Sequence, residues 1–382
     1  MKKILILFGT RPEAIKMASV IQQLRDRASK FKIIICITAQ HREMIDQALK
    51  MFNIFPDYDL DIMKKNQDLF DITTNLLIKI KNIIKKEKPD LVMVQGDTTT
   101  AFVASLAAYY FKIPIAHIEA GLRTHKKYSP FPEEKNRHLL SVLTDFHFAP
   151  TEWAKSNLLS ENIPEEKIWV TGNTVIDALL EVCSRQKEKD KKDSWIKYFK
   201  EKWNLAIPNN FNDKKLILVT GHRRESFGKK FRNICMAIKE IAENIKDIII
   251  VYPVHLNPNV KKPAELILDK KPNIYLIEPL EYEPFVFLMN NCYLVLTDSG
   301  GIQEESPSLG KPVLVMRDVT ERPEGVRAGV VKLIGTNKDN IVKEIKNLLE
   351  NSCLYERMSK GANPYGDGNA AKRIANIIMK KL

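Results

Sequence analysis

Short runs of apolar residues alternate with segments of helical periodicity along most of the chain, and this pattern constrains the fold more than any other sequence feature. In the first half the apolar runs are Lys2–Phe8, Ile33–Thr38, Leu91–Val94, Ile113–Ile118, Phe146–Ala149 and Ile168–Thr171. Runs that are apolar along their whole length are typical of parallel strands buried on both faces. Strands that alternate with helices at this spacing predict a doubly wound parallel sheet.

The alternation restarts in the second half, at Lys215–Thr220, Ile248–Pro253, Ile274–Ile277, Tyr293–Thr297 and Pro312–Met316. A chain of 382 residues is also longer than one simple core usually accommodates. We therefore expect an α/β protein with two doubly wound domains, residues 1–172 and 173–366, joined at a hinge near Gly172-Asn173-Thr174. The lysine-rich stretch 184–202 is expected to form a solvated surface helix or arm.

The net charge of +13 leaves several classes of partner open at first. A basic protein can bind nucleic acid, an anionic membrane surface or a phosphorylated small molecule. Here the lysines are spread along the chain with few aromatic residues among them, and no zinc-finger, basic-zipper or RNA-recognition pattern is present. We therefore expect lysine-rich solvated faces and no nucleic-acid site.

The five cysteines are far apart and form no C-x-x-C pair. An odd number of unpaired cysteines indicates a reducing compartment and argues against a metal cluster. No stretch approaches the length of a transmembrane helix. The sequence therefore predicts a cytoplasmic protein without a membrane partner.

The stretch Tyr293–Pro307 joins a predicted strand to a predicted helix through Ser299, Gly300 and Gly301. We expect a tight glycine turn, with the helix beginning near Ile302. Backbone N–H groups that converge at a helix start, together with the helix dipole, favour a phosphate group. Glu304 and Glu305 are expected in the first helical turn, where a carboxylate could accept sugar hydroxyl groups. The alternative is an ordinary link in which Ser299 only caps the helix.

Several charged residues follow the predicted strands of the first half. Arg11 and Lys16 come after the first strand, Asp97 and Glu119 follow two later strands, and Glu133 opens a helix after a proline-rich loop. Ligands of open α/β sheets bind beyond the carboxyl ends of the strands. Each carboxylate alone could be a helix cap or a partner of the helix dipole. Three of them at neighbouring strand ends or the adjoining loop suggest proton transfer.

The second half places His222 between a glycine and two arginines at the end of a predicted strand. This arrangement favours an anion-binding role for His222. Neither G-x-x-x-x-G-K-[ST] nor G-x-G-x-x-G is present, which argues against ATPases and dinucleotide enzymes. No D-x-D-like pair offers an obvious divalent-metal site for the phosphates. The residues alone thus predict a two-domain protein that holds a phosphorylated ligand between its domains.

Ten motifs extend over nearly the whole chain in order: FGTRPEAIKMA (8–18), TAQHREM (38–44), GDTTT (96–100), EAGLRT (119–124), SPFPEEKNR (129–137), TGNTVIDAL (171–179), TGHRRESFG (220–228), YPVHLNPNV (252–260), DSGGIQEE (298–305) and GKPVLVMRDVTERPE (310–324). Together they resemble the bacterial non-hydrolysing UDP-N-acetylglucosamine 2-epimerases. The resemblance implies the glycosyltransferase-B-like fold, in which two Rossmann-like domains face each other across a cleft. It also implies that the C-terminal helix, residues 367–382, packs on the N-terminal domain and that the protein is a homodimer.

The resemblance implies the reversible interconversion of UDP-N-acetylglucosamine and UDP-N-acetylmannosamine, for surface polysaccharide synthesis. UDP would be eliminated across C1 and C2 to give a 2-acetamidoglucal, and UDP would then add back with a proton on the opposite face of C2. No nicotinamide and no metal cofactor is implied. The C2 proton is weakly acidic, so a positioned base is needed, and the departing diphosphate needs preorganised positive partners.

The resemblance also assigns residues to roles. Asp97, Glu119 and Glu133 match the catalytic carboxylates, and His222 matches a histidine that assists departure of the phosphate. The substrate-binding positions would be Arg11, Lys16, Arg137, Ser299, Gly300, Gly301 and Glu305, with the Ser-Gly-Gly turn at the phosphates and Glu305 at the ribose. Which carboxylate removes the C2 proton and which returns it stays open.

The sequence differs from the family pattern at two places, and three other functions are still open. Ser226 replaces a common asparagine, and Gln40-His41-Arg42-Glu43 with Asn66 departs from the pattern of members that are activated by a second substrate molecule. The rivals are a hydrolysing 2-epimerase that releases N-acetylmannosamine, a glycosyltransferase, and a nucleotide-sugar sensor. Carboxylates beside a polyanionic ligand would weaken binding, which argues against a sensor.

Overall fold

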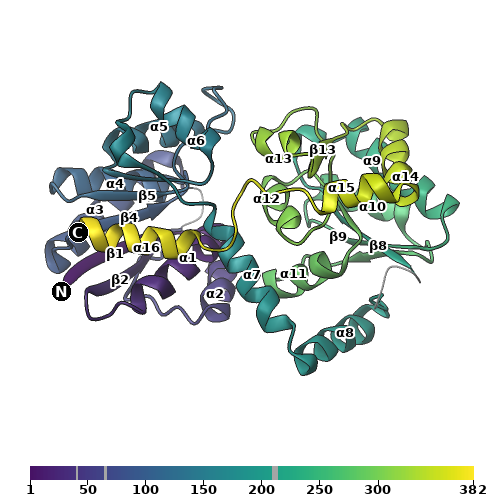
Figure 1. Ribbon diagram of the computed structural model, residues 1–382, viewed down its shortest axis with the longest axis horizontal. Helices are drawn as coiled ribbons and strands as arrows, with labels where there is room; N and C mark the ends of the chain where they lie inside the picture. The colour runs from purple at the N-terminus through teal and green to yellow at the C-terminus, as the bar shows by residue number, and fades with distance from the viewer. Residues whose placement is uncertain (40–41, 64–66, 209–213) are drawn as a thin grey trace. The chain divides into compact units, whose positions relative to one another are not determined.

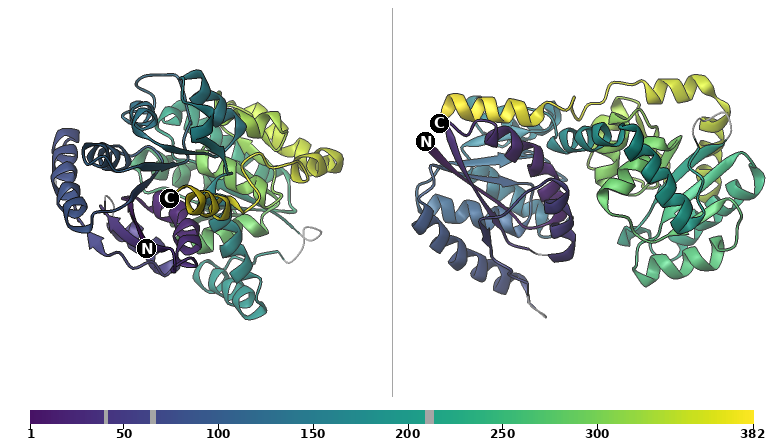
Figure 2. Two further views of the ribbon diagram at one scale, coloured as in Figure 1. Left: turned by 60° about the vertical axis from the view of Figure 1, so that its left-hand side comes forward. Right: turned by 90° about the horizontal axis from the view of Figure 1, so that it is seen from below.

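The computed structural model describes residues 1–39, 42–63, 67–208 and 214–382, which form two compact units (Figure 1). The first unit consists of residues 1–178 and 365–382, and the second of residues 179–364. The predicted hinge at Gly172-Asn173-Thr174 leads into helix α7 (Thr174–Gln186), within which the chain passes from the first unit to the second. Both chain termini lie in the first unit (Figures 1 and 2).

The first unit contains a seven-stranded parallel sheet in the order β3-β2-β1-β4-β5-β6-β7 within the described residues. The strands are β1 (Lys2–Phe8), β2 (Phe31–Ile37), β3 (Tyr58–Asp59), β4 (Leu91–Gln95), β5 (Ile115–Ile118), β6 (Phe146–Ala149) and β7 (Ile168–Val170). On β1, Leu5 pairs with Ile34 on one side and with Val92 on the other. The strand order reverses between β1 and β4, which is the place where open α/β sheets bind ligands.

Helices cover both faces of this sheet. They are α1 (Arg11–Arg25), α2 (Arg42–Met51), α3 (Leu69–Glu87), α4 (Thr99–Tyr110), α5 (Glu133–Leu143), α6 (Glu152–Ser160) and α16 (Ala370–Lys381). The spacing of Leu76, Ile80, Ile83 and Ile84 gives α3 one apolar side, which packs into a core with β1, β4 and α4. Asp68 begins α3 because its carboxylate accepts a hydrogen bond from the backbone N–H of Asp71 at 2.8 Å.

The last helix, α16, packs against α1 of the first unit (Figures 1 and 2). The buried carboxylate of Asp177 accepts hydrogen bonds from the backbone N–H groups of Ala370 at 3.2 Å and Ala371 at 2.9 Å. Arg27 from the segment after α1 donates to the side-chain oxygen of Asn376 at 2.8 Å. Asp177 thus satisfies N–H groups that a helix start otherwise leaves unpaired.

The second unit contains a six-stranded parallel sheet in the order β10-β9-β8-β11-β12-β13 within the described residues. The strands are β8 (Lys215–Thr220), β9 (Ile248–Pro253), β10 (Ile274–Ile277), β11 (Leu294–Thr297), β12 (Val313–Val315) and β13 (Val331–Leu333). The order reverses between β8 and β11. The predicted fold class, two Rossmann-like doubly wound domains, is therefore confirmed for each unit.

The helices of the second unit are α8 (Lys189–Trp203), α9 (Lys229–Asn244), α10 (Pro258–Leu268), α11 (Tyr282–Asn291), α12 (Gly300–Ser308), α13 (Pro323–Arg327), α14 (Lys338–Glu350) and α15 (Ser352–Ser359). Helix α9 packs between α10 and α14 and buries Ile234, Ile238 and Ile241 against the sheet. The apolar residues of α9 recur three and four positions apart, which explains why one side of it is buried.

Helix α8 is more firmly packed than its lysine-rich sequence predicts. Phe199 is fully buried. Its ring stacks on Phe287 at 5.9 Å between centroids and on Trp203 at 5.6 Å. Many of the lysines are exposed, as expected for a solvated face, but Phe199 is buried and the other aromatic side chains of the helix are half-buried.

Candidate active site

Glu119 lies directly after β5 and forms an ion pair with Lys16 of α1. Both side chains are largely buried, with exposed fractions of 9% and 13%. The backbone of Glu119 has φ of +68°, in the left-handed region that few residues other than glycine adopt. Such conformations concentrate at functional sites. The strand end therefore holds a carboxylate in a fixed place with a cation against it.

Asp97 follows the neighbouring strand β4 and is held by α5. Arg137 donates to Asp97 Oδ2 from Nε at 2.8 Å, and its Nη2 lies 2.6 Å from the same oxygen. Asn136 donates to the backbone carbonyl of Asp97 at 2.9 Å. Arg137 in turn donates from Nη1 to the buried Glu134 at 2.8 Å, and Glu134 also accepts the N–H of Thr124. This network fixes the start of α5 beside the end of β4.

Glu133 is the first residue of α5, next to this network. Its Oε2 is buried and has no hydrogen-bond partner among the described residues. Buried carboxylate oxygens are nearly always paired, so an exception needs an explanation. An unpaired oxygen of this kind is able to accept a proton or a substrate hydroxyl group.

Arg11 begins α1 at the end of β1, and the loop that carries it is fastened by Glu13. The Glu13 carboxylate accepts hydrogen bonds from the N–H of Gly9 at 3.0 Å, the N–H of Thr10 at 2.8 Å and the hydroxyl of Thr98 at 2.7 Å. Burial raises the pKa of the Glu13 carboxyl, and these hydrogen bonds oppose that rise. Glu13 therefore joins the loop that carries Arg11 to the loop that carries Asp97.

In the second unit, His222 follows β8 and Asp298 follows the adjacent strand β11. Asp298 is fully buried, and its Oδ2 accepts hydrogen bonds from the N–H groups of His222 and Arg223, each at 2.8 Å. His222 is 41% exposed at its side chain. Burial lowers the pKa of His222, and the negative charge of Asp298 opposes this effect.

The Ser-Gly-Gly turn differs from the sequence-based expectation in one respect. Helix α12 begins at Gly300 rather than near Ile302, and Glu304 and Glu305 therefore lie beyond its first turn. Ser299 is the N-cap residue, but its hydroxyl makes no capping hydrogen bond. The expectation was wrong because it treated both glycines as turn residues, whereas Gly300 serves a close approach. A Cβ built on Gly300 would lie 2.5 Å from Nη1 of Arg322.

Arg322 belongs to a network of arginines and carboxylates around this turn. Its Nε donates to Glu304 at 2.5 Å and its Nη1 donates to Glu321 at 2.8 Å. Arg317 also donates to Glu321, at 2.9 Å, and Arg223 lies 3.4 Å from it. Burial alone raises the pKa of Glu321, but Arg322, Arg317 and Arg223 outweigh burial and lower it to about 2. The guanidinium groups are therefore held in place beside the helix start.

Glu305 lies about one helical turn after Gly301 in α12, and it is 7% exposed. Its Oε2 accepts a hydrogen bond from the hydroxyl of Tyr282 at 2.8 Å.

Comparison with known proteins places these features in one family. A model of the family described as UDP-N-acetylglucosamine 2-epimerase matches residues 23–379. The UDP-N-acetylglucosamine 2-epimerase of Campylobacter jejuni is 55% identical over 382 residues, which is 99% of this chain and 98% of that protein. The enzyme of the same name from Escherichia coli K12 is 55% identical over 98% of both chains. This chain belongs to the UDP-N-acetylglucosamine 2-epimerase family.

A solved member of the family agrees with the structure as well. The crystal structure of UDP-GlcNAc 2-epimerase from Neisseria meningitidis bound to UDP-GlcNAc has a TM-score of 0.91 and 52% identity, and the match covers 99% of this chain and 100% of that chain. The predicted family and the glycosyltransferase-B-like fold class are thus confirmed.

Within the UDP-N-acetylglucosamine 2-epimerase family fold, the predicted site residues fall into two groups. The first unit holds Arg11, Lys16, Asp97, Glu119, Glu133 and Arg137, and the second holds His222, Ser299, Gly300, Gly301 and Glu305. The structure joins Lys16 to Glu119 and Arg137 to Asp97 directly. Their roles in catalysis and binding stay predictions.

Three residues of this 2-epimerase fold were not predicted as functional: Glu13, Asp298 and Arg322. Each lies inside a motif that carries the resemblance. Their side chains act on loops and residues distant in sequence, as Arg322 does on Gly300. Only the tertiary structure reveals such contacts.

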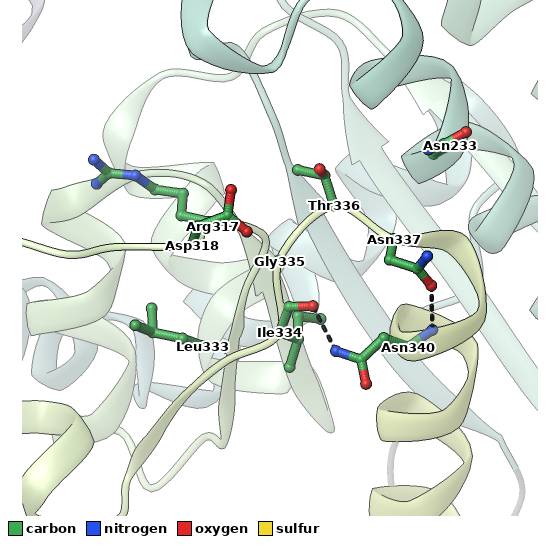
Figure 3. A pocket seen from close by; sticks show the side chains of 9 residues that line it. All are labelled: Asn233, Arg317, Asp318, Leu333, Ile334, Gly335, Thr336, Asn337 and Asn340. Carbon is green, nitrogen blue, oxygen red and sulfur yellow. Dashed lines mark hydrogen bonds between the residues drawn. The ribbon is translucent and has the colours of Figure 1, made fainter.

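The second unit also contains a concave region (Figure 3). It is lined by Asn233, Arg317, Asp318, Leu333, Ile334, Gly335, Thr336, Asn337 and Asn340. Asn340 donates to the carbonyl of Ile334 at 2.7 Å. The guanidinium of Arg317 points away from Thr336 and Asn337 (Figure 3). The hydrogen bonds drawn in Figure 3 join Asn340, at the start of α14, to the loop that precedes this helix.

Three further observations concern the described residues alone. They contain no group of three or more His, Cys, Asp or Glu side chains arranged to hold a metal ion. No helix among them is long and apolar enough to cross a membrane. Gln40, His41 and Asn66, which were compared above with members activated by a second substrate molecule, lie outside the described residues.

Proposed function

We propose that this protein is a non-hydrolysing UDP-N-acetylglucosamine 2-epimerase that interconverts UDP-N-acetylglucosamine and UDP-N-acetylmannosamine. The observation that carries the proposal is the set of three carboxylates at one end of the first sheet. Asp97 and Glu119 are held by cations, and Glu133 has a buried oxygen without a partner in the described structure. Removing a proton from one face of C2 and returning it to the opposite face requires more than one carboxyl group.

The reaction would proceed by elimination and re-addition. A carboxylate of the first unit removes the C2 proton, the bond from C1 to the diphosphate oxygen breaks, and a double bond forms between C1 and C2. UDP then bonds again to C1 while a second carboxylic acid delivers a proton to the opposite face of C2. A positioned acid or base contributes about 10²- to 10⁴-fold to such a step.

The second unit would bind the UDP portion. N–H groups at the start of α12 and the positive end of its dipole suit a phosphate, and His222 suits proton exchange with the departing diphosphate. Glu305, already bonded to Tyr282, would accept ribose hydroxyl groups. The Neisseria meningitidis relative binds UDP-GlcNAc, which supports this choice of substrate. We also expect a homodimer that supplies N-acetylmannosamine units for surface polysaccharide.

Proton NMR of the purified protein with UDP-N-acetylglucosamine in D₂O tests the proposal. We expect UDP-N-acetylmannosamine to appear and deuterium to enter C2 of both nucleotide sugars. Accumulation of free N-acetylmannosamine and UDP would instead establish a hydrolysing enzyme. No reaction with either nucleotide sugar would refute the proposal.

Glu133→Gln tests the carboxylate assignment, because glutamine keeps the shape of the side chain and cannot take a proton. We expect turnover to fall by about 10²-fold or more. Glu152→Gln is the matched control, since Glu152 is also a first-turn glutamate of a helix in the first unit but is exposed. Equal turnover in the two variants would contradict a catalytic role for Glu133.

A further inference from the structure

Asp298 is the most deeply buried carboxylate beside a predicted site residue of the second unit. It lies at the end of β11, where its own N–H donates to the carbonyl of Thr220 on β8 at 3.2 Å. Its Oδ2 accepts the N–H groups of His222 and Arg223. Among the described residues, the only basic side chain within ion-pair distance of Asp298 is the imidazole of His222.

The second oxygen of Asp298 is turned toward that imidazole. Oδ1 lies 3.3 Å from Nδ1 of His222, yet no hydrogen bond joins the two atoms, and Oδ1 has no other partner in the described parts of the chain. A buried carboxylate oxygen without a donor is unfavourable. A small rotation of the imidazole would align Nδ1–H with Oδ1, and hydrogen bonds at active sites often tighten only when the ligand binds.

Two other groups near His222 disfavour its protonated form. The ring of His255 stacks on His222, with centroids 5.6 Å apart and planes at 17°. Its own Nδ1 accepts the N–H of Asn257 at 3.1 Å. His255 and Arg223 both lower the pKa of His222, whereas Asp298 raises it. A further titratable side chain nearby, Tyr252, donates its hydroxyl to the carbonyl of Gly221 at 2.9 Å.

We propose that Asp298 is a positioning residue that holds His222 in the Nδ1–H tautomer, so that Nε2 is the atom that exchanges a proton with the substrate diphosphate. The inference rests on the proposed function. In the elimination, imidazolium Nε2–H gives its proton to the departing diphosphate oxygen as the C1–O bond breaks. In the re-addition, neutral Nε2 takes the proton back. The carboxylate of Asp298 balances the positive charge while the proton is on Nε2.

The substitution Asp298→Asn distinguishes control of the His222 tautomer from the structural role of accepting two backbone N–H groups. The amide oxygen of asparagine can still accept the N–H groups of His222 and Arg223, while its NH₂ group then faces Nδ1 of His222. Nδ1 must therefore accept, so neutral His222 carries its proton on Nε2, and the imidazolium meets a donor instead of an acceptor. The variant should fold, yet it should lose the form of His222 that transfers a proton.

NMR of protein labelled with ¹⁵N-histidine reads the tautomer and the pKa of His222 directly, with His222→Gln identifying its signals. We expect the Nδ1–H tautomer in the unmodified protein. In Asp298→Asn we expect the Nε2–H tautomer and a lower pKa of His222. Turnover should fall by about 100-fold while the KM for UDP-N-acetylglucosamine changes only a few-fold. Asp177→Asn is the control, because Asp177 also accepts two backbone N–H groups but faces no histidine.

The outcomes are distinguishable. An Nε2–H tautomer in the unmodified protein overturns the proposal even if Asp298→Asn does not fold. A loss of turnover without change of tautomer or pKa, or an equal loss in Asp177→Asn, assigns Asp298 a purely structural role and also overturns it. If the unmodified protein does not epimerise, the proposed function fails, and the NMR result still decides whether Asp298 controls His222.

Discussion

Replacing Gly300 by alanine should destabilise the second unit, although alanine usually stabilises a helix relative to glycine. A Cβ at Gly300 would lie 2.5 Å from Nη1 and 2.8 Å from Cζ of Arg322. The tip of an arginine can ordinarily move aside, but this one is bonded to Glu304 at 2.5 Å and to Glu321 at 2.8 Å. Gly301 is a matched control in the same helical turn, since its Cβ would meet only the Glu305 carboxylate, at 3.5 Å.

The magnitude follows from the contacts of Arg322. To reach ordinary contact the guanidinium must move by roughly 1 Å, which weakens two hydrogen bonds between charged groups worth about 1.5–3 kcal/mol each. Glu304 is nearly fully buried, so its lost partner is not replaced by water. Against this stands a gain of at most about 0.5–1 kcal/mol from alanine, the value for the middle of a helix, because Gly300 is the first residue of α12. We expect a net loss of about 1–3 kcal/mol for Gly300→Ala and a small gain for Gly301→Ala.

Scanning calorimetry measures both variants. For a domain of this size about 1 kcal/mol shifts Tm by roughly 2–4 °C, so the transition of the second unit should fall by several degrees for Gly300→Ala and rise slightly for Gly301→Ala. In an Arg322→Met background the penalty for Gly300→Ala should disappear. The reasoning is refuted if both variants behave alike, or if the penalty persists without the arginine.

Two further predictions concern buried side chains. Burial raises the folded-state pKa of Glu13 above its ordinary value of 4.5. The protonated carboxyl therefore stabilises the folded state. This contribution is fully present below pH 4.5 and is lost as the pH rises through the folded-state pKa. The stability of the unmodified protein relative to Glu13→Gln should therefore decrease as pH rises from 4, and thermal melts at a series of pH values would contradict this with a flat or opposite trend. Phe199→Ala should cost about 3–5 kcal/mol, because the fully buried ring stacks on Phe287 and Trp203. Tyr109→Ala, at a residue that is 58% exposed, is its control in urea unfolding, and equal effects would contradict the packing of α8.

The two sheets could be predicted from the sequence because their central strands are continuous apolar runs. Lys2–Phe8 and Lys215–Thr220 lie in the middle of their sheets, and strands buried on both faces leave a strong hydrophobic signal. The edge strand β13 was missed, because Val331–Leu333 has only three residues with a lysine in the middle. So short a run does not differ from a loop in composition.

The candidate site was predictable only in part, for a different reason. Asp97, Glu119 and His222 follow strands, so the rule for open α/β sheets draws attention to them. Arg322 and Asp298 act through contacts with residues whose chain positions are far away, and no local pattern reveals such contacts. The start of α12 was misplaced for the same reason, since the need for glycine at position 300 arises from an arginine 22 positions later.

The return of α16 to the first unit has a consequence for synthesis on the ribosome. Residues 179–364 must all be made before the helix that covers α1 leaves the exit tunnel. At about 5–20 residues per second the first unit waits roughly ten to forty seconds for its last element. During that interval Asp177 has no helix start to bind, and the apolar side of α16 has no counterpart on α1. The N-terminal unit of the nascent chain therefore exposes the apolar surface that α16 covers until the second unit is complete.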